Sequence, residues 1–210
     1  IIANPDIHVT PRCIRRVKDA LDKTQGAVAA SARVKDPMGG ELFSYWTLLP
    51  LWKDLLDTGL VTRRLFKAML NTPSYRLAYA GDEDCRLVDA VPGSFFMLKT
   101  GILTPGEIKE VFDKHIFLYY EEKVLGQKFR KMGLKTVLVT DESYVHAHSV
   151  SIDKSFKRIV DKQRLLHRSK LYYYKEYLGT GPAGMAAARA VLGLVLAEVW
   201  FLTVVCRMRW

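Results

Sequence analysis

Hydrophobic residues follow two different spacings along the chain, and the two spacings alternate. Apolar runs and period-two alternation predict strands, whereas apolar residues every three to four positions predict helices. The predicted strands are residues 1–3, 26–34, 94–99 and 134–140, followed by an extended segment at 143–152. The predicted helices are 10–24, two or three within 42–80, one that starts at 104, 121–132, 153–178 and an apolar helix from 183 onward. Strands that alternate with helices indicate an α/β fold.

Local signals mark the ends of several predicted helices. Thr10 is a good N-cap and Pro11 occupies the first helical position. Thr104 is the expected cap of the next short helix, and Gly133 is the expected stop of the helix at 121–132. The Leu- and Trp-rich region 42–80 has no such clear boundaries. It is interpreted either as a helical insertion that packs on the core or as an element that faces a membrane or an acceptor.

Charge and cysteine content narrow the expected partners. The 210-residue chain has a net charge of +10, which favours acidic partners such as nucleic acid, anionic lipid or phosphate-bearing substrates. None of the usual nucleic-acid-binding motifs occurs, so nucleic acid is not expected as a partner. Cys13, Cys85 and Cys206 are far apart and form no C-x-x-C pair, which predicts a reducing, cytosolic environment.

Two groups of carboxylates are candidates for chemistry. Asp6 ends the turn Asn4–Pro5–Asp6 directly after a predicted strand, where open α/β sheets bind ligands, and its oxygens suit Mg²⁺ or Mn²⁺ on a diphosphate. The same tripeptide is also good turn chemistry. Glu121 and Glu122 follow the apolar segment FLYY and precede a basic helix. They are interpreted either as a charged helix start or as a carboxylate that deprotonates a hydroxyl nucleophile.

Two further features remain open from the residues alone. His146 and His148 share one face of a predicted strand, where they complete a metal or phosphate site or have a purely structural role. The apolar run 183–206 is long enough to span a bilayer, but it contains Arg189 and Glu198. It therefore predicts a membrane span, a helix lying in the interface, or a helix packed on a partner helix.

Taken in order, these segments resemble a family-2 glycosyltransferase of the bacterial cell-surface polysaccharide type. The segments are NPDI (4–7), VPGSFFMLK (91–99), FDKHIFLYYEEKVLGQKFRKMG (112–133) and VHAHSVSI (145–152). The resemblance implies a partial GT-A fold, in which a mixed sheet is flanked by helices and followed by the C-terminal apolar helix. It also implies an inverting, metal-dependent transfer from a nucleotide-sugar donor to a saccharide acceptor, expected to be lipid-linked.

The resemblance also assigns roles to residues. Asp6 matches the metal-binding turn that holds Mg²⁺ or Mn²⁺ on the donor diphosphate. Glu122, with Glu121 beside it, matches the general base, although the family's usual pair is glutamate–aspartate. Gly93 and Ser94 match the acceptor-side strand. His146 matches a histidine near the metal and diphosphate. His148 is expected to bind the donor or the acceptor together with His146.

The family's layout sets the expected organisation and location. Residues 1–152 are expected to be the carboxyl-terminal two-thirds of a catalytic domain, because the family's nucleotide-binding strands come before the turn, which implies roughly 80–100 further residues ahead of Ile1. Residues 153–182 are expected to be a basic helical stretch, and 183–210 a membrane-associated helix at the cytoplasmic face of the cell membrane. The processive Q-x-x-R-W motif is absent, which predicts addition of a single sugar.

A second hypothesis treats the chain as a non-catalytic, membrane-associated assembly module. In that case Asp6, Glu121 and Glu122 are turn and helix-cap residues, and the apolar helices form the functional surface. The enzyme hypothesis requires Asp6, Glu122 and His146 to converge, whereas the assembly hypothesis allows them to scatter.

Overall fold

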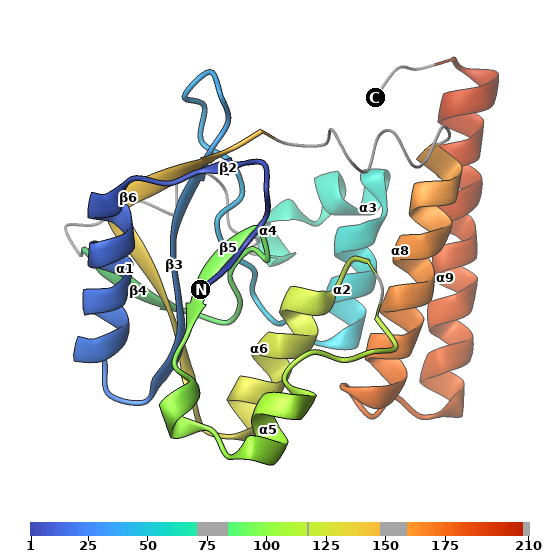
Figure 1. Ribbon diagram of the computed structural model, residues 1–210. Coiled ribbons are helices and arrows are strands. Elements are labelled where there is room, and N and C mark those ends of the chain that lie inside the picture. The colour runs from blue at the N-terminus through green and yellow to red at the C-terminus, as the bar shows by residue number, and fades with distance from the viewer. Residues whose placement is uncertain (71–83, 117, 148–158, 208–210) are drawn as a thin grey trace. The chain divides into compact units, whose positions relative to one another are not determined.

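The computed structural model describes residues 1–70, 84–116, 118–147 and 159–207 (Figure 1). These residues fall into two units that alternate along the sequence. The first unit contains residues 1–48, 84–114 and 121–147, and the second contains 49–70, 115–120 without 117, and 159–207. The chain is α/β. The first unit holds a mixed sheet flanked by helices, and the described part of the second is helical, including the apolar C-terminal helix.

The sheet of the first unit is built around one parallel pair of strands. Its strands are β1 (Ile2–Ala3), β2 (Ile7–His8), β3 (Ala27–Lys35), β4 (Cys85–Val88), β5 (Phe95–Leu98) and β6 (Lys135–His146). The strand order is β1-β5-β3-β6-β2, and β4 also pairs with β6. β3 runs parallel to β6, while the pairs β1–β5, β3–β5, β4–β6 and β2–β6 are antiparallel. β4 pairs with residues 136–139 of β6, and β2 pairs with residues 145–146. The two short strands therefore pair with different parts of the same long strand.

Helices cover both faces of this sheet, and capping residues define their ends. The helices are α1 (Pro11–Lys23), α5 (Pro105–Glu110) and α6 (Glu121–Lys131), with a 3₁₀ turn at Thr100–Ile102. Thr10 caps α1 by accepting the Cys13 N–H at 3.1 Å. Thr104 and Glu107 form a capping box on α5. Gly133 follows α6 with φ +70°, a conformation that glycine adopts without strain.

The core of the first unit has two parts, one on each face of the sheet. On one face, Val17 and Leu21 of α1 pack with Val34 of β3 and Val137 of β6. On the other face, Phe129 of α6 belongs to a cluster that includes residues of β3, β5 and β6. Burial on both faces explains why β3 is a nearly continuous apolar run in the sequence.

β6 is longer than the sequence predicted because the strand continues past the polar residues 140–142, which form a bulge. The prediction separated 134–140 from 143–152, but one strand continues to His146. Ala32 and Arg33 of β3 pair with Val139 and Ser143, which leaves residues 140–142 without partners in β3. Two carboxylates of this bulge form ion pairs with arginines of α1. The polar residues therefore lie within the strand without being buried unpaired.

The described part of the second unit consists of short helices and a helical hairpin. Its helices are α2 (Leu51–Thr58), α3 (Leu60–Leu65), α4 (Lys67–Leu70), α8 (Ile159–Glu176) and α9 (Pro182–Trp200), followed by a π-helical turn at Phe201–Val205. α9 contacts α8 and α2. It buries a stripe of residues three or four apart: Met185, Ala188, Leu192, Val195 and Val199. Pro182–Val205 is long and apolar enough to cross a membrane, a property it shares with core helices of soluble proteins.

Most of the predicted elements are confirmed within the described residues. The helices expected in 42–80 are α2, α3 and α4, and residues 71–80 lie outside the described part of the chain. The helix expected at 153–178 is confirmed from Ile159 onward, while 148–158 are outside it as well. The structure adds β4, which the sequence pattern did not predict.

Candidate active site

The turn that carries Asp6 is held against the end of β6. The chain leaves β1, turns through Asn4–Pro5–Asp6 and enters β2, where Ile7 pairs with His146. The Ala147 N–H donates to the Asp6 backbone carbonyl at 3.0 Å. This pairing brings Asp6 Oδ1 to 3.4 Å from His146 Nε2. The structure therefore places two predicted site residues side by side, and the third predicted residue of this group, His148, lies outside the described residues.

Glu122 lies in the first turn of α6 and contacts the loop before β5. The Gly93 N–H donates to Glu122 Oε1 at 3.2 Å. The side chain of Glu122 is partly buried, whereas most glutamates remain at the surface. The unpaired N–H groups of a helix start also favour a negative charge at this position. The structure thus joins two predicted site residues, Gly93 and Glu122, through one hydrogen bond.

Burial makes Glu122 a weak acid with a pKa in the neutral range. Burial is the largest cause, and the negative charge of Glu121 is the second; together they raise the pKa of Glu122 to about 7. Hydrogen bonds from the Glu122 and Gly93 N–H groups oppose this shift. Burial also raises the pKa of Glu121. Its Oε2 atom is buried without a hydrogen-bond partner among the described residues. A carboxyl with a pKa near 7 can both accept and release a proton at neutral pH.

Ser94 connects the Asn4–Pro5–Asp6 turn to the strand that carries His146. The Asn4 N–H donates to the Ser94 backbone carbonyl at 2.8 Å. The Ser94 hydroxyl lies 2.7 Å from the Tyr144 hydroxyl, and both side chains are buried. Tyr144 is two residues before His146 on β6. The loop before β5 therefore contacts three other segments of the first unit. These are the turn after β1, the start of α6 and the end of β6.

Tyr144 is a residue of this site that the sequence interpretation missed. Burial raises its pKa, so the phenol stays protonated and available as a hydrogen-bond donor. A signal existed in the sequence, because Tyr144 is at the i−2 position from His146 and alternate residues of a strand share a face. Its partner Ser94 could not have been identified this way, since the two residues are 50 positions apart.

The chemistry of Asp6 and His146 fits a divalent ion that is shared with a substrate. Mg²⁺ is commonly held by one or two carboxylates together with substrate phosphates and water, and Mn²⁺ accepts oxygen and imidazole ligands. Among the described residues, no group of three or more His, Cys, Asp or Glu side chains lies close enough to hold a metal alone. Asp6 and His146 can therefore supply part of a coordination shell that a diphosphate would complete.

A separate cavity lies at the other end of α6. It has a volume of about 420 Å³ and is lined in part by Tyr45, Asp89, Gly126 and Arg130. Arg130 forms an ion pair with Asp89 at 2.7 Å. The predicted site residues do not line this cavity. Its lining comes from distant segments, so the sequence offered no signal for it.

Two comparisons with known proteins gave no match. No protein-family model matches the chain. No curated protein matches it either.

Proposed function

We propose that this chain is the catalytic part of a metal-dependent, inverting glycosyltransferase of the GT-A type. It would transfer a sugar from a nucleotide-sugar donor to a saccharide acceptor, and the acceptor would be lipid-linked. The observation that carries this proposal is Glu122, a partly buried carboxyl with a pKa near 7 that contacts Gly93. A mixed sheet with helices on both faces supports the GT-A assignment, and Asp6 beside His146 supports a diphosphate-bearing donor.

In this mechanism Glu122 acts on the acceptor hydroxyl. Its ionised carboxylate takes the hydroxyl proton while the acceptor oxygen forms a bond to the anomeric carbon of the donor. The bond from that carbon to the diphosphate breaks, and the nucleoside diphosphate leaves with the bonding electron pair. Attack opposite the departing group inverts the configuration. Glu122 is a better candidate than Glu121 because it contacts Gly93 and because its pKa of about 7 is close to neutral pH, where a base works best.

The remaining residues bind and orient the reactants. Asp6 and His146 would hold Mg²⁺ or Mn²⁺ against the donor diphosphate. When bound, the ion neutralises negative charge on the departing diphosphate. Gly93 orients the base through its N–H, and Ser94 fixes the loop by its contact with Tyr144. The partners of Gly93 and Ser94 thus support an acceptor-side role for this loop.

Exposed apolar side chains in the second unit support a location at the cytoplasmic face of the cell membrane. Leu194, Trp200 and Phe201 at the C-terminal helix are half or more exposed, and so is Leu65 of α3. Arg64 in the last turn of α3 and Arg207 add positive charge that suits anionic headgroups. A membrane surface is therefore the proposed third partner, beside the donor and the acceptor.

The test is a transfer assay with Mn²⁺ and a panel of nucleotide sugars, in which nucleoside diphosphate release and transfer to lipid-linked saccharides are measured. The chain is compared with Glu122→Gln and Glu121→Gln, and with Glu107→Gln as a matched control from the exposed capping box. We expect Glu122→Gln to abolish transfer and Glu107→Gln to leave it unchanged. If Glu122→Gln retains full transfer, the assignment of the base to Glu122 is wrong, and if Glu121→Gln retains it as well, neither carboxylate is the base.

The assembly-module hypothesis rests on the same exposed apolar residues of α3 and α9. It predicts binding to anionic vesicles without release of a nucleoside diphosphate from any donor. Vesicle binding together with complete absence of transfer, both in this chain and in the parent protein with the residues expected ahead of Ile1, would favour it over the enzyme.

A further inference from the structure

Two consecutive tyrosines directly before α6 have an unfavourable backbone conformation. Tyr119 has φ +65° and Tyr120 has φ +71°, in the left-handed region that residues other than glycine seldom adopt. Such residues persist where surrounding contacts hold them, and they concentrate at functional sites. The next two residues in the chain are Glu121 and Glu122, the first residues of α6. The two strained residues therefore directly precede the first residues of α6.

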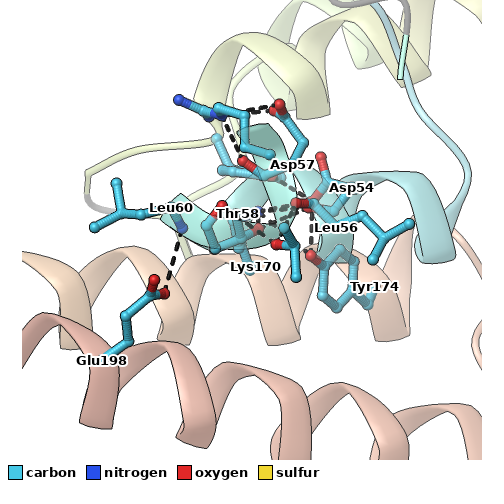
Figure 2. A network of polar contacts seen from close by, with 12 residues as sticks. Asp54, Leu56, Asp57, Thr58, Leu60, Lys170, Tyr174 and Glu198 are labelled. Atoms are coloured by element: carbon cyan, nitrogen blue, oxygen red, sulfur yellow. Dashed lines mark hydrogen bonds and ion pairs between the residues drawn. The ribbon is translucent and has the colours of Figure 1, made fainter. Parts of the chain in front are cut away.

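A buried ionic cluster in the second unit holds Tyr120. The Tyr120 hydroxyl donates to Asp54 Oδ2 at 2.5 Å. The same oxygen accepts the Tyr174 hydroxyl at 2.6 Å and lies 2.9 Å from Lys170 Nζ. Figure 2 shows Lys170 and Tyr174 reaching Asp54 on α2 from α8. The exposed fractions of the Asp54 and Lys170 side chains are 1% and 6%, so this ion pair is shielded from water.

The ring and the backbone of the same segment are held as well. Lys170 Nζ lies 5.0 Å from the centre of the Tyr120 ring, and Tyr173 packs edge-on against that ring at 5.2 Å. The Ser169 hydroxyl donates to the Leu118 carbonyl at 2.8 Å. Burial raises the pKa of Tyr120 well above its ordinary value, so its hydroxyl remains a donor at any working pH. The phenol, the ring and the neighbouring backbone are thus all fixed by residues of α2 and α8.

We propose that Tyr120 is a positioning residue: anchored to Asp54 in the second unit, it holds the strained backbone that sets the orientation of the carboxylate pair at the start of α6. The catalytic meaning of this role rests on the proposed function, whereas the positioning itself does not. Residue 120 is the last residue of its segment in the second unit, and residue 121 begins a segment of the first unit. Asp54, Lys170 and Tyr174 have no direct part in the reaction.

The test compares two tyrosines that bind the same carboxylate oxygen. Tyr120→Phe removes the hydrogen bond of the residue next to α6. Tyr174→Phe is the matched control, because it removes a hydrogen bond to the same Asp54 atom but leaves Tyr120 anchored. The Gly93 amide proton reports on Glu122, since it donates to that carboxylate, and its NMR shift is followed from about pH 5 to about pH 9.

In the unmodified chain the Gly93 resonance should titrate with a midpoint near 7. We expect Tyr120→Phe to lower this midpoint by about one unit or more as Glu122 becomes exposed, and Tyr174→Phe to leave it unchanged. An unchanged midpoint in Tyr120→Phe, or equal shifts in both variants, would overturn the proposal. If Tyr120→Phe does not fold, Tyr119→Gly decides the question. It relieves one strained residue and keeps the anchor, so any shift of the Gly93 midpoint would contradict the proposal.

The transfer assay separates this inference from the proposed function. Tyr120→Phe should lower kcat with little change in the KM for the nucleotide sugar, because donor-binding residues are untouched. If the parent protein, with the residues expected ahead of Ile1, shows no transfer while the Gly93 titration behaves as expected, the proposed function fails and the positioning role of Tyr120 stands.

Discussion

Replacing Glu122 with glutamine should stabilise the protein at alkaline pH while it abolishes the proposed transfer. The pKa of Glu122 is raised from its ordinary value of 4.5 to about 7, mainly by burial. One pKa unit corresponds to about 1.4 kcal/mol, so the ionised side chain costs the fold roughly 3 kcal/mol. Glutamine has the shape of the protonated acid and can still accept the Gly93 N–H, but it never ionises.

The sign follows from proton binding. Between pH 4.5 and about 7 the folded protein retains a proton on Glu122 that the unfolded chain has released. The free energy of unfolding therefore decreases as the pH rises through this window, and the loss is complete above it. Glu122→Gln should lack this contribution. It should match the unmodified chain near pH 4.5 and exceed its stability by up to roughly 3 kcal/mol at pH 8.

The assay is urea denaturation across this pH range for both chains and for Glu107→Gln. Glu107 is a suitable control because its hydrogen bonds to Thr104 lower its pKa, the opposite direction. Its contribution to stability is present above pH 4.5 and lost below, so its glutamine variant should gain nothing at pH 8. If Glu122→Gln is no more stable than the unmodified chain at pH 8, Glu122 is not a strained buried acid, and the reasoning about the base fails.

Three further predictions concern the rest of the chain. Asp54→Ala should lower the free energy of unfolding by about 3–5 kcal/mol in a denaturation assay, because it leaves Lys170 charged and buried without its counter-ion. Glu198→Ala should accelerate hydrogen exchange at the first two amides of α3, which donate to the Glu198 carboxylate, at a cost of about 1 kcal/mol. Figure 2 shows the first of these contacts, from Leu60, and unchanged exchange would contradict the prediction. A thiol reagent at pH 8 should modify the exposed Cys206 and spare Cys13, because Cys13 is fully buried and burial raises its pKa to about 11. Rapid labelling of Cys13 in mass spectrometry of the native protein would contradict this prediction.

The elements that the sequence predicted best are those specified by neighbouring residues. The start of α1 follows from Thr10 and Pro11, and the end of α6 from Gly133, because caps act over a few positions. Because such signals act only between neighbouring residues, the sequence predicted two separate segments where the structure has the single strand β6. The polar residues 140–142 look like a break, but β6 pairs with β3 again from Ser143, and Asp141 and Glu142 form ion pairs with arginines of α1.

The candidate site was predicted one residue at a time, and its connections were not. Asp6, Gly93, Ser94, Glu122 and His146 were singled out from motifs, but nothing in the sequence specified which of them touch. The contact between Ser94 and Tyr144 depends on the strand order of the sheet, and the anchor of Tyr120 depends on a partner 66 positions earlier. Such pairings are decided by tertiary structure, which a local pattern does not contain.

The alternation of the two units along the sequence has a consequence for synthesis of the protein on the ribosome. Asp54 and its counter-ion Lys170 are 116 residues apart. At about 5–20 residues added per second, Lys170 is made roughly 6 to 23 s after Asp54. During that delay α2 has an acidic side chain that is costly to bury without its partner. The second unit can therefore complete its core only after Lys170 has been made, and folding should be slow because its contacts join distant parts of the chain.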